Sequence, residues 1–127
     1  MTIRTIMLAS TLLAQLSATA LADGDVAKGQ QISKKCVACH QFEKPENRIG
    51  PHLVGVIGRP VASVEGFKYS PAMIAHATTV PVWDEAALNA YLENPRGIVP
   101  GTKMAFGGLK KPAERADLLA YLKSIAK

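Results

Sequence analysis

The 127-residue sequence predicts an all-α domain with unusually long loops. Four segments after Asp23 place apolar residues at helical spacing, whereas the alternating runs of half-buried strands are nearly absent. Gly- and Pro-containing stretches, residues 50–60 and 95–108, lie between the predicted helices. Loops of this length are uncommon in a compact domain unless they serve a function. We therefore expect them to surround something other than a protein core.

Residues 1–22 are interpreted as a signal peptide that is cleaved after Ala22. Arg4 supplies a positive charge, residues 6–16 are mostly apolar, and Ala20-Leu21-Ala22 is a small-residue cleavage pattern. A retained membrane anchor is the alternative, but polar residues interrupt the run before the roughly 20 apolar residues that a spanning helix needs. Cleavage predicts a periplasmic protein with one domain, residues 23–127.

Four helices are predicted, over residues 25–39, 70–76, 84–94 and 111–127. The first has small and apolar residues at helical spacing. The second and third begin at a Ser or Asp N-cap, and the third ends before Pro95. The fourth has Pro in its first turn, acidic residues early, lysines late and one apolar face.

Both cysteines lie in the motif Cys36-Val37-Ala38-Cys39-His40, the strongest local signal in the chain. Two thiols at this spacing can add to the vinyl groups of a haem while the following imidazole faces the iron. A disulfide is one alternative, but a thioredoxin-like motif is expected near a βαβ pattern. Half of a zinc site is another, but His52 and His76 lack a paired spacing with the motif. The motif favours one covalently attached haem c.

A haem also solves a problem of size. Removal of residues 1–22 leaves 105 residues and lowers the formal net charge from +5 to +4. A chain of this size buries only about 60–70% of its unfolded surface. Two cysteines cannot provide the several disulfides that small exported domains use. We expect the flat apolar ring to serve as the core.

The sixth iron ligand decides the function, because an open position invites ligand binding whereas a Met-plus-His pair favours electron transfer. Met104 lies in residues 100–108, where glycines on both sides let the backbone approach a ring closely. Met73 lies in the short second helix, where a packing role is more ordinary. The spacing favours Met104, and His52 and His76 are interpreted as ordinary loop or surface histidines.

Motifs along the whole mature chain match one family. They are Gly24 to Gly29, Cys36 to His40, Gly50 to Arg59, Gly66 to Tyr69, Trp83, Tyr91 to Pro95, Pro100 to Phe106 and the last helix. The chain resembles the class I c-type cytochromes, in the group of mitochondrial cytochrome c and bacterial cytochrome c2. The resemblance implies a cytochrome c fold around one covalent haem.

The resemblance also implies roles for single residues. Cys36 and Cys39 match the thioether cysteines, His40 the proximal ligand and Met104 the distal ligand. Pro51 matches the proline whose carbonyl accepts the proximal imidazole N–H, a bond that fixes the ring orientation. The remaining matches are Arg59, Tyr69 and Trp83 near the haem propionates, Tyr91 and Thr102 near the distal Met, and Phe106 over the ring edge. Core packing is the alternative for Tyr91 and Phe106.

The chain departs from the family pattern in two places, at residues 32–33 and at residue 73. Ile32 and Ser33 stand where many relatives have an aromatic residue, so we expect a weaker contact between the first and last helices. Met73 stands where the mitochondrial proteins usually carry Asn.

Lysines cluster near the motifs, and the resemblance places them around the exposed haem edge: Lys34, Lys35, Lys103, Lys110 and Lys111. A solvated basic face is the plain alternative, but such charge also steers an acidic redox partner. Candidate partners are a cytochrome bc1 complex, a terminal oxidase, a photosynthetic reaction centre, a peroxidase and a periplasmic dehydrogenase. Nucleic acid is excluded as a partner, because the basic cluster is small and no recognition motif is present.

The sequence therefore predicts an exported, monomeric one-electron carrier that is not an enzyme. Three alternatives stay open. They are a haem enzyme or gas-binding protein with a labile sixth ligand, a thiol–disulfide oxidoreductase that uses Cys36 and Cys39, and a fixed cytochrome subunit of a larger oxidoreductase.

Overall fold

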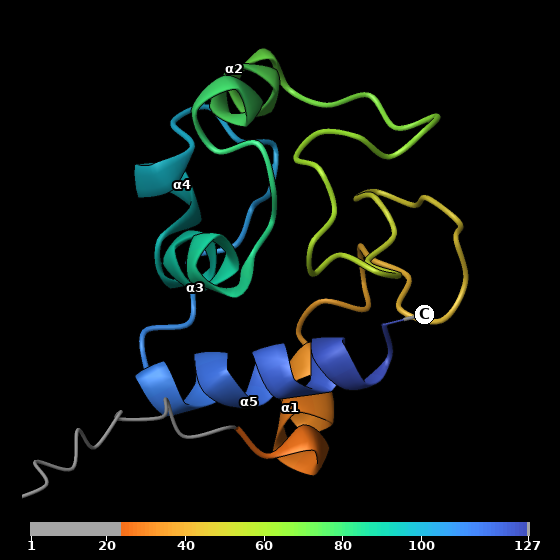
Figure 1. The fold of residues 1–127 in the computed structure, drawn as a ribbon, viewed down its shortest axis with the longest axis vertical. Helices are drawn as coiled ribbons and strands as arrows, with labels where there is room; N and C mark the ends of the chain where they lie inside the picture. Colours follow the sequence, from red (N-terminus) through yellow and green to blue (C-terminus); the bar gives the residue numbers. More distant parts are fainter. Residues whose placement is uncertain (1–23, 127) are drawn as a thin grey trace, which may run out of the picture.

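The computed structural model describes residues 24–126, so the predicted signal peptide lies outside the described residues. The helices of this part are α1 (Val26–Ser33), α2 (Pro71–Thr79), α3 (Glu85–Glu93), α4 (Pro95–Ile98) and α5 (Pro112–Ser124) (Figure 1). Residues 24–126 contain no strand and only one isolated bridge, between Pro60 and Val82. The predicted all-α fold is confirmed. None of the described helices is long and apolar enough to cross a membrane.

Side-chain caps begin α1, α2 and α3. Asp25, Ser70 and Asp84 each accept a hydrogen bond from the backbone N–H three residues later, which satisfies a donor that the first helical turn leaves unpaired. Ser70 and Asp84 are the predicted caps. The second helix continues to Thr79, one turn beyond the predicted end at His76.

The first helix is shorter than the sequence predicts. It ends at Ser33 instead of Cys39, and residues 34–39 form hydrogen-bonded turns. The N–H groups of Lys34, Lys35 and Cys36 bond to carbonyls three residues back, as in a 3₁₀ turn. Apolar spacing of three to four residues is compatible with both turn types, so the pattern did not reveal the change.

A short helix lies where the sequence predicts only a loop. Pro95 ends α3 as expected, but it also begins α4. The Asn94 side chain accepts a hydrogen bond from Gly97 N at 3.1 Å, and Pro fits the first turn because it needs no N–H partner there. The prediction of an unbroken loop over residues 95–108 was therefore wrong at its start.

Helices α1 and α5 cross in close contact at one end of the molecule (Figure 1). Gly29 is buried at the crossing, and a Cβ there would overlap the carbonyl oxygen of Asp117. Asp25 N donates to Asp117 Oδ1 at 2.7 Å. Phe42 packs against Tyr121 of α5, with ring centroids 5.9 Å apart, and so supplies an aromatic contact from outside α1.

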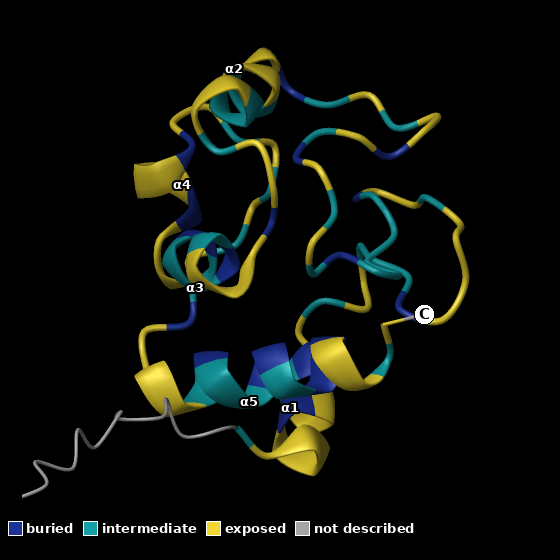
Figure 2. Ribbon diagram, viewed as in Figure 1, coloured by how far each residue is buried: buried dark blue, intermediate teal, exposed yellow. Residues whose placement is uncertain are grey.

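The remaining helices and the loops lie on one side of the α1–α5 crossing (Figure 1). Figure 2 shows buried residues along the middle of α5, whereas α2 has none. The buried residues of α3, Leu88 and Tyr91, belong to the same hydrophobic core as the buried residues of α5. Two long loops, residues 41–69 and 99–111, connect these elements and carry much of the lining of the site described next.

Replacement of Gly29 by Ala tests the α1–α5 crossing. Gly29→Ala should lower the free energy of unfolding of the haem-loaded protein by about 2–3 kcal/mol in urea, because overpacking outweighs the roughly 1 kcal/mol that Ala adds in helix propensity. Gln31→Ala, an exposed control on the same helix, should change it by less than about 0.5 kcal/mol. A Gly29→Ala protein as stable as the wild type would contradict this packing.

Candidate functional site

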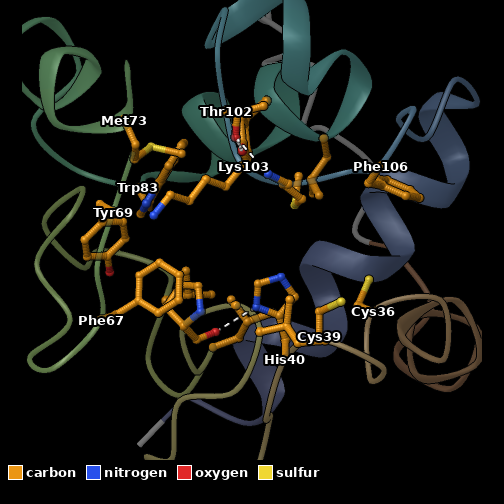
Figure 3. Close-up of a pocket in the computed structure, with 18 of the residues that line it drawn as sticks. Cys36, Cys39, His40, Phe67, Tyr69, Met73, Trp83, Thr102, Lys103 and Phe106 are labelled. Carbon is orange, nitrogen blue, oxygen red and sulfur yellow. Dashed lines mark hydrogen bonds between the residues drawn. The ribbon is translucent and has the colours of Figure 1, made fainter. Parts of the chain in front are cut away.

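A cavity of about 300 Å³ lies between the Cys36–His40 segment, the two long loops, α2 and α3 (Figure 3). Its lining is mainly apolar, with Leu53, Val56, Leu88 and Leu92 among its walls. All the residues that the sequence singled out as site residues line it: Cys36, Cys39, His40, Pro51, Arg59, Tyr69, Trp83, Tyr91, Thr102, Met104 and Phe106.

The tight turn after α1 brings both thiols to the cavity. Cys39 N donates to Cys36 O at 3.1 Å, and His40 N donates to the same oxygen at 2.9 Å. Both cysteines are free and half-buried. Burial raises the pKa of the Cys36 thiol, and the nearby Lys35 charge only partly opposes this shift. Thiols that perform disulfide exchange usually have a lowered pKa, so this environment does not favour the oxidoreductase alternative.

A hydrogen bond fixes the ring of His40. Its Nδ1 lies 2.7 Å from Pro51 O, and because a carbonyl oxygen can only accept, Nδ1 carries the proton. The lone pair is then on Nε2. Burial lowers the pKa of His40, the Pro51 bond partly opposes this, and the Arg59 charge lowers the pKa further. Gly50 packs against the ring so closely that a Cβ there would overlap it. The site thus holds a neutral, oriented imidazole, the form that binds metal ions.

A half-buried cation with an unused donor also lines the cavity. Arg59 Nη1 donates to His52 O at 2.8 Å, but Arg59 Nε is buried and has no partner in the described structure. Burial also lowers the pKa of Arg59. The Tyr69 hydroxyl accepts from Val64 N at 3.0 Å, which leaves its own proton to donate. An unpaired buried donor is costly, so this wall suits an anionic group that supplies acceptors.

On another wall, hydroxyl groups organise the loop that carries Met104. Tyr91 OH and Thr102 Oγ1 are 2.8 Å apart, and Met104 N donates to Thr102 Oγ1 at 3.4 Å. Burial raises the pKa of Tyr91, and the bond to Thr102 opposes the shift. The Tyr91 hydroxyl therefore stays protonated at neutral pH. Met73 also lines the cavity, so two thioethers face the same space.

Sequence reasoning missed several lining residues. Phe67 lines the cavity and contacts Tyr69 edge to face, with ring centroids 4.8 Å apart. Its position two residues before Tyr69 could have predicted that Phe67 lines the site, because alternate residues of an extended segment share a face. Lys103 was expected on a docking face; it also lines the cavity, and its Nζ donates to Lys68 O at 2.8 Å. Neither His52 nor His76 lines the cavity, and the His76 ring packs on Trp83.

A family model described as Cytochrome c matches residues 26–126. The chain belongs to the cytochrome c family. It is 50% identical over 109 residues to the cytochrome c2 of Rhodomicrobium vannielii, which covers 84% of this chain and 83% of that protein. It is 48% identical over 109 residues to the cytochrome c of Gibberella zeae, covering 84% of this chain and 100% of that protein. The solved structure of cytochrome cH from Methylobacterium extorquens matches with a TM-score of 0.72 and 40% identity, over 80% of this chain and 99% of that one.

As a cytochrome c, the protein carries one covalently attached haem c and transfers electrons, and it is not an enzyme. The cavity fits this cofactor on its own evidence. Two thiols lie beside a neutral imidazole, the walls are apolar, and Arg59 offers a buried N–H that has no other partner. Within residues 24–126, no three His, Cys, Asp or Glu side chains form a group that could hold a metal ion, so the zinc alternative gains no support.

Proposed function

We propose that this cytochrome c is a periplasmic one-electron carrier whose haem iron is ligated by His40 and Met104. The haem supplies the redox chemistry, with the iron alternating between its ferrous and ferric states. The observation that carries the proposal is the convergence of Cys36, Cys39, His40 and Met104 on one apolar cavity. A site that keeps both axial ligands in place favours electron transfer over ligand binding.

The proximal side supports this assignment most directly. We assign Cys36 and Cys39 to the thioether bonds and His40 Nε2 to the iron. The Pro51 carbonyl holds the opposite ring nitrogen, which fixes the tautomer and makes the imidazole a stronger donor. Burial keeps His40 neutral, so no proton competes with the iron near pH 7.

On the distal side two methionines compete for the same position. Met104 lies in a loop, and its backbone N–H bonds to Thr102, which is itself joined to Tyr91. Met73 lies on α2, and Figure 3 shows it with Tyr69 and Trp83, the residues that we assign to the propionates. The Tyr91–Thr102 pair organises the backbone at Met104, which supports Met104 as the ligand.

The rest of the lining supports the cofactor in two ways. We assign Arg59, Tyr69 and Trp83 to the propionates, because a carboxylate in an apolar site needs donors and Arg59 Nε has no other partner. Phe106 lines the cavity together with Cys36, and there it would cover the ring edge and limit access of water. A drier site strengthens the electrostatic contacts inside it.

Replacement of each methionine tests the ligation. In the ferrous wild type, carbon monoxide should not bind readily, because Met104 occupies the sixth position. Met104→Ala should create an open site that binds carbon monoxide within the mixing time, seen as a shift of the Soret band. Met73→Ala is the matched control and should behave as the wild type. If Met73→Ala opens the site and Met104→Ala does not, the two roles are exchanged.

Export is the second part of the proposal. Residues 1–22 have the charged, apolar and small-residue regions of a signal peptide. We therefore place the mature protein, from Asp23 onward, in the periplasm.

Mass spectrometry of the periplasmic fraction tests export. The expected mass is that of 105 residues beginning at Asp23 plus one haem. Ala22→Leu should impair cleavage, because the site requires small residues, and should retain the longer chain. Recovery of the wild-type chain with residue 1 intact would show that the segment is retained.

The third part concerns the docking surface. Lys34, Lys35, Lys103, Lys110 and Lys111 are all exposed, and Lys35 and Lys103 line the cavity itself. The ammonium groups of Lys103 and Lys110 bond to the carbonyls of Lys68 and Glu93, which fixes their positions. Ile49, also on the cavity rim, is 80% exposed. We propose that an acidic redox partner docks here, with its apolar centre on Ile49.

Charge reversal tests this surface, with the anionic oxidant ferricyanide as the probe. Lys35→Glu should slow oxidation of the reduced protein several-fold at low ionic strength, and the difference should shrink as salt screens the charges. Lys28→Glu makes the same charge change at an exposed α1 position outside the cavity lining. Equal slowing by both variants would show that the net charge of the protein, and not a local docking surface, controls the rate of oxidation.

A further inference from the structure

The loop that carries Met104, residues 99–111, has few backbone bonds of its own. Within the described chain, no backbone–backbone hydrogen bond involves residues 103–108. The nearest is Thr102 N to Val99 O, at 2.9 Å. Segments with so few backbone bonds open at a low free-energy cost. The position of Met104 therefore depends on the side-chain bonds of Thr102 and Lys103 and on the contacts that fix the ends of the loop.

The end nearest α5 is joined to the last turn of α3. Leu109 N donates to Leu92 O at 2.7 Å, and Lys110 Nζ donates to Glu93 O at 2.6 Å. Gly108 has φ +108°, and a Cβ there would overlap the Glu93 carbonyl. The backbone at this end can lie so close to α3 only because residue 108 is glycine.

One buried guanidinium joins this end of the loop to two helices. Arg115, on α5, is only 5% exposed. Its Nη1 donates to Leu109 O at 2.8 Å and to Lys110 O at 3.1 Å, and its Nε donates to Asn89 Oδ1 of α3 at 2.9 Å. Its Nη2 lies 3.8 Å from Glu93 Oε2. Arg115 does not line the cavity.

Loss of these bonds raises the free energy of the open form of the loop. If residues 103–110 move away, the guanidinium stays on α5 and loses two carbonyl acceptors. A buried charge with unsatisfied donors is strongly unfavourable. We propose that Arg115 is a positioning residue that keeps the loop closed, and so sets how readily an external ligand replaces Met104. This inference rests on the proposed Met104 ligation.

The affinity of exogenous imidazole for the ferric protein measures this property. Imidazole can bind the iron only in molecules whose Met104 has left it, so its apparent affinity scales with the open fraction. Arg115→Lys keeps the charge but replaces the planar, multi-donor group by a single ammonium. It should raise the imidazole affinity about tenfold or more. Asn89→Ala, which removes only the Nε acceptor, should raise it by a smaller factor.

A matched control separates positioning from general stability. Tyr121 lies on the same helix, is 8% exposed and packs on Phe42. Tyr121→Leu should lower the free energy of unfolding but leave the imidazole affinity within about twofold of the wild type. A similar rise in Tyr121→Leu and Arg115→Lys, or no rise in Arg115→Lys, would overturn the inference. If Arg115→Lys does not fold, the imidazole affinity of Asn89→Ala decides instead. No rise in Asn89→Ala, or a similar rise in Tyr121→Leu, would then overturn the inference.

Met104→Ala distinguishes the two levels of the argument. If it does not raise the imidazole affinity, Met104 is not the ligand, and the proposed ligation fails together with the inference. If Met104→Ala raises the affinity while Arg115→Lys and Asn89→Ala do not, the ligation stands and only the role of Arg115 is wrong.

Discussion

A central apolar cavity is the constraint on which this structure depends. At roughly 24 cal/mol per Å³, an unfilled cavity of about 300 Å³ would cost on the order of 7 kcal/mol. That is comparable to the whole net stability of a small domain, about 5–15 kcal/mol. The helices cannot close the space themselves, because α2 buries no residue and α4 buries only Pro95. The covalent haem is therefore part of the folding free energy as well as the redox centre.

The same constraint explains the division of the chain into a rigid and a weakly bonded part. The α1–α5 crossing packs through Gly29 without help from the cavity, and the Asp25–Asp117 bond ties the two ends of the domain together. The loop of residues 99–111 has few backbone bonds and lines the cavity, whereas residues 41–69 are held by several, among them Gly58 N to Trp83 O at 2.8 Å and Val61 N to Pro81 O at 2.9 Å. The order of residues 99–111 depends on the cofactor and on a few side-chain bonds such as Lys103 to Lys68.

The proximal part of the candidate site could be predicted from the sequence because its chemistry is local, whereas the positions from Pro51 to Phe106 rested mainly on the family resemblance. Cys36, Cys39 and His40 are adjacent in the chain, and Ser70 and Asp84 are short-range cap signals that the structure reproduces. The end of α1 and the presence of α4 were not predicted, because apolar spacing does not separate an α-helical turn from a 3₁₀ turn and Pro95 can both end and begin a helix. The contacts of Arg115 were not predictable either, since its partners lie up to 26 positions away and two are backbone carbonyls.

Arg59 and Arg115 differ in how far their buried donor atoms are paired within the chain. Arg115 directs its donors to Leu109 O, Lys110 O and Asn89 Oδ1, all from the chain itself. Arg59 uses Nη1 within the chain but leaves a buried Nε unpaired. Because a folded chain rarely leaves a buried donor unsatisfied, an Nε without a partner within residues 24–126 suits an acceptor supplied by a bound group. Arg115 is 5% exposed and Arg59 is half-buried, and their bonding supports a role in the loop for Arg115 and the proposed propionate contact for Arg59.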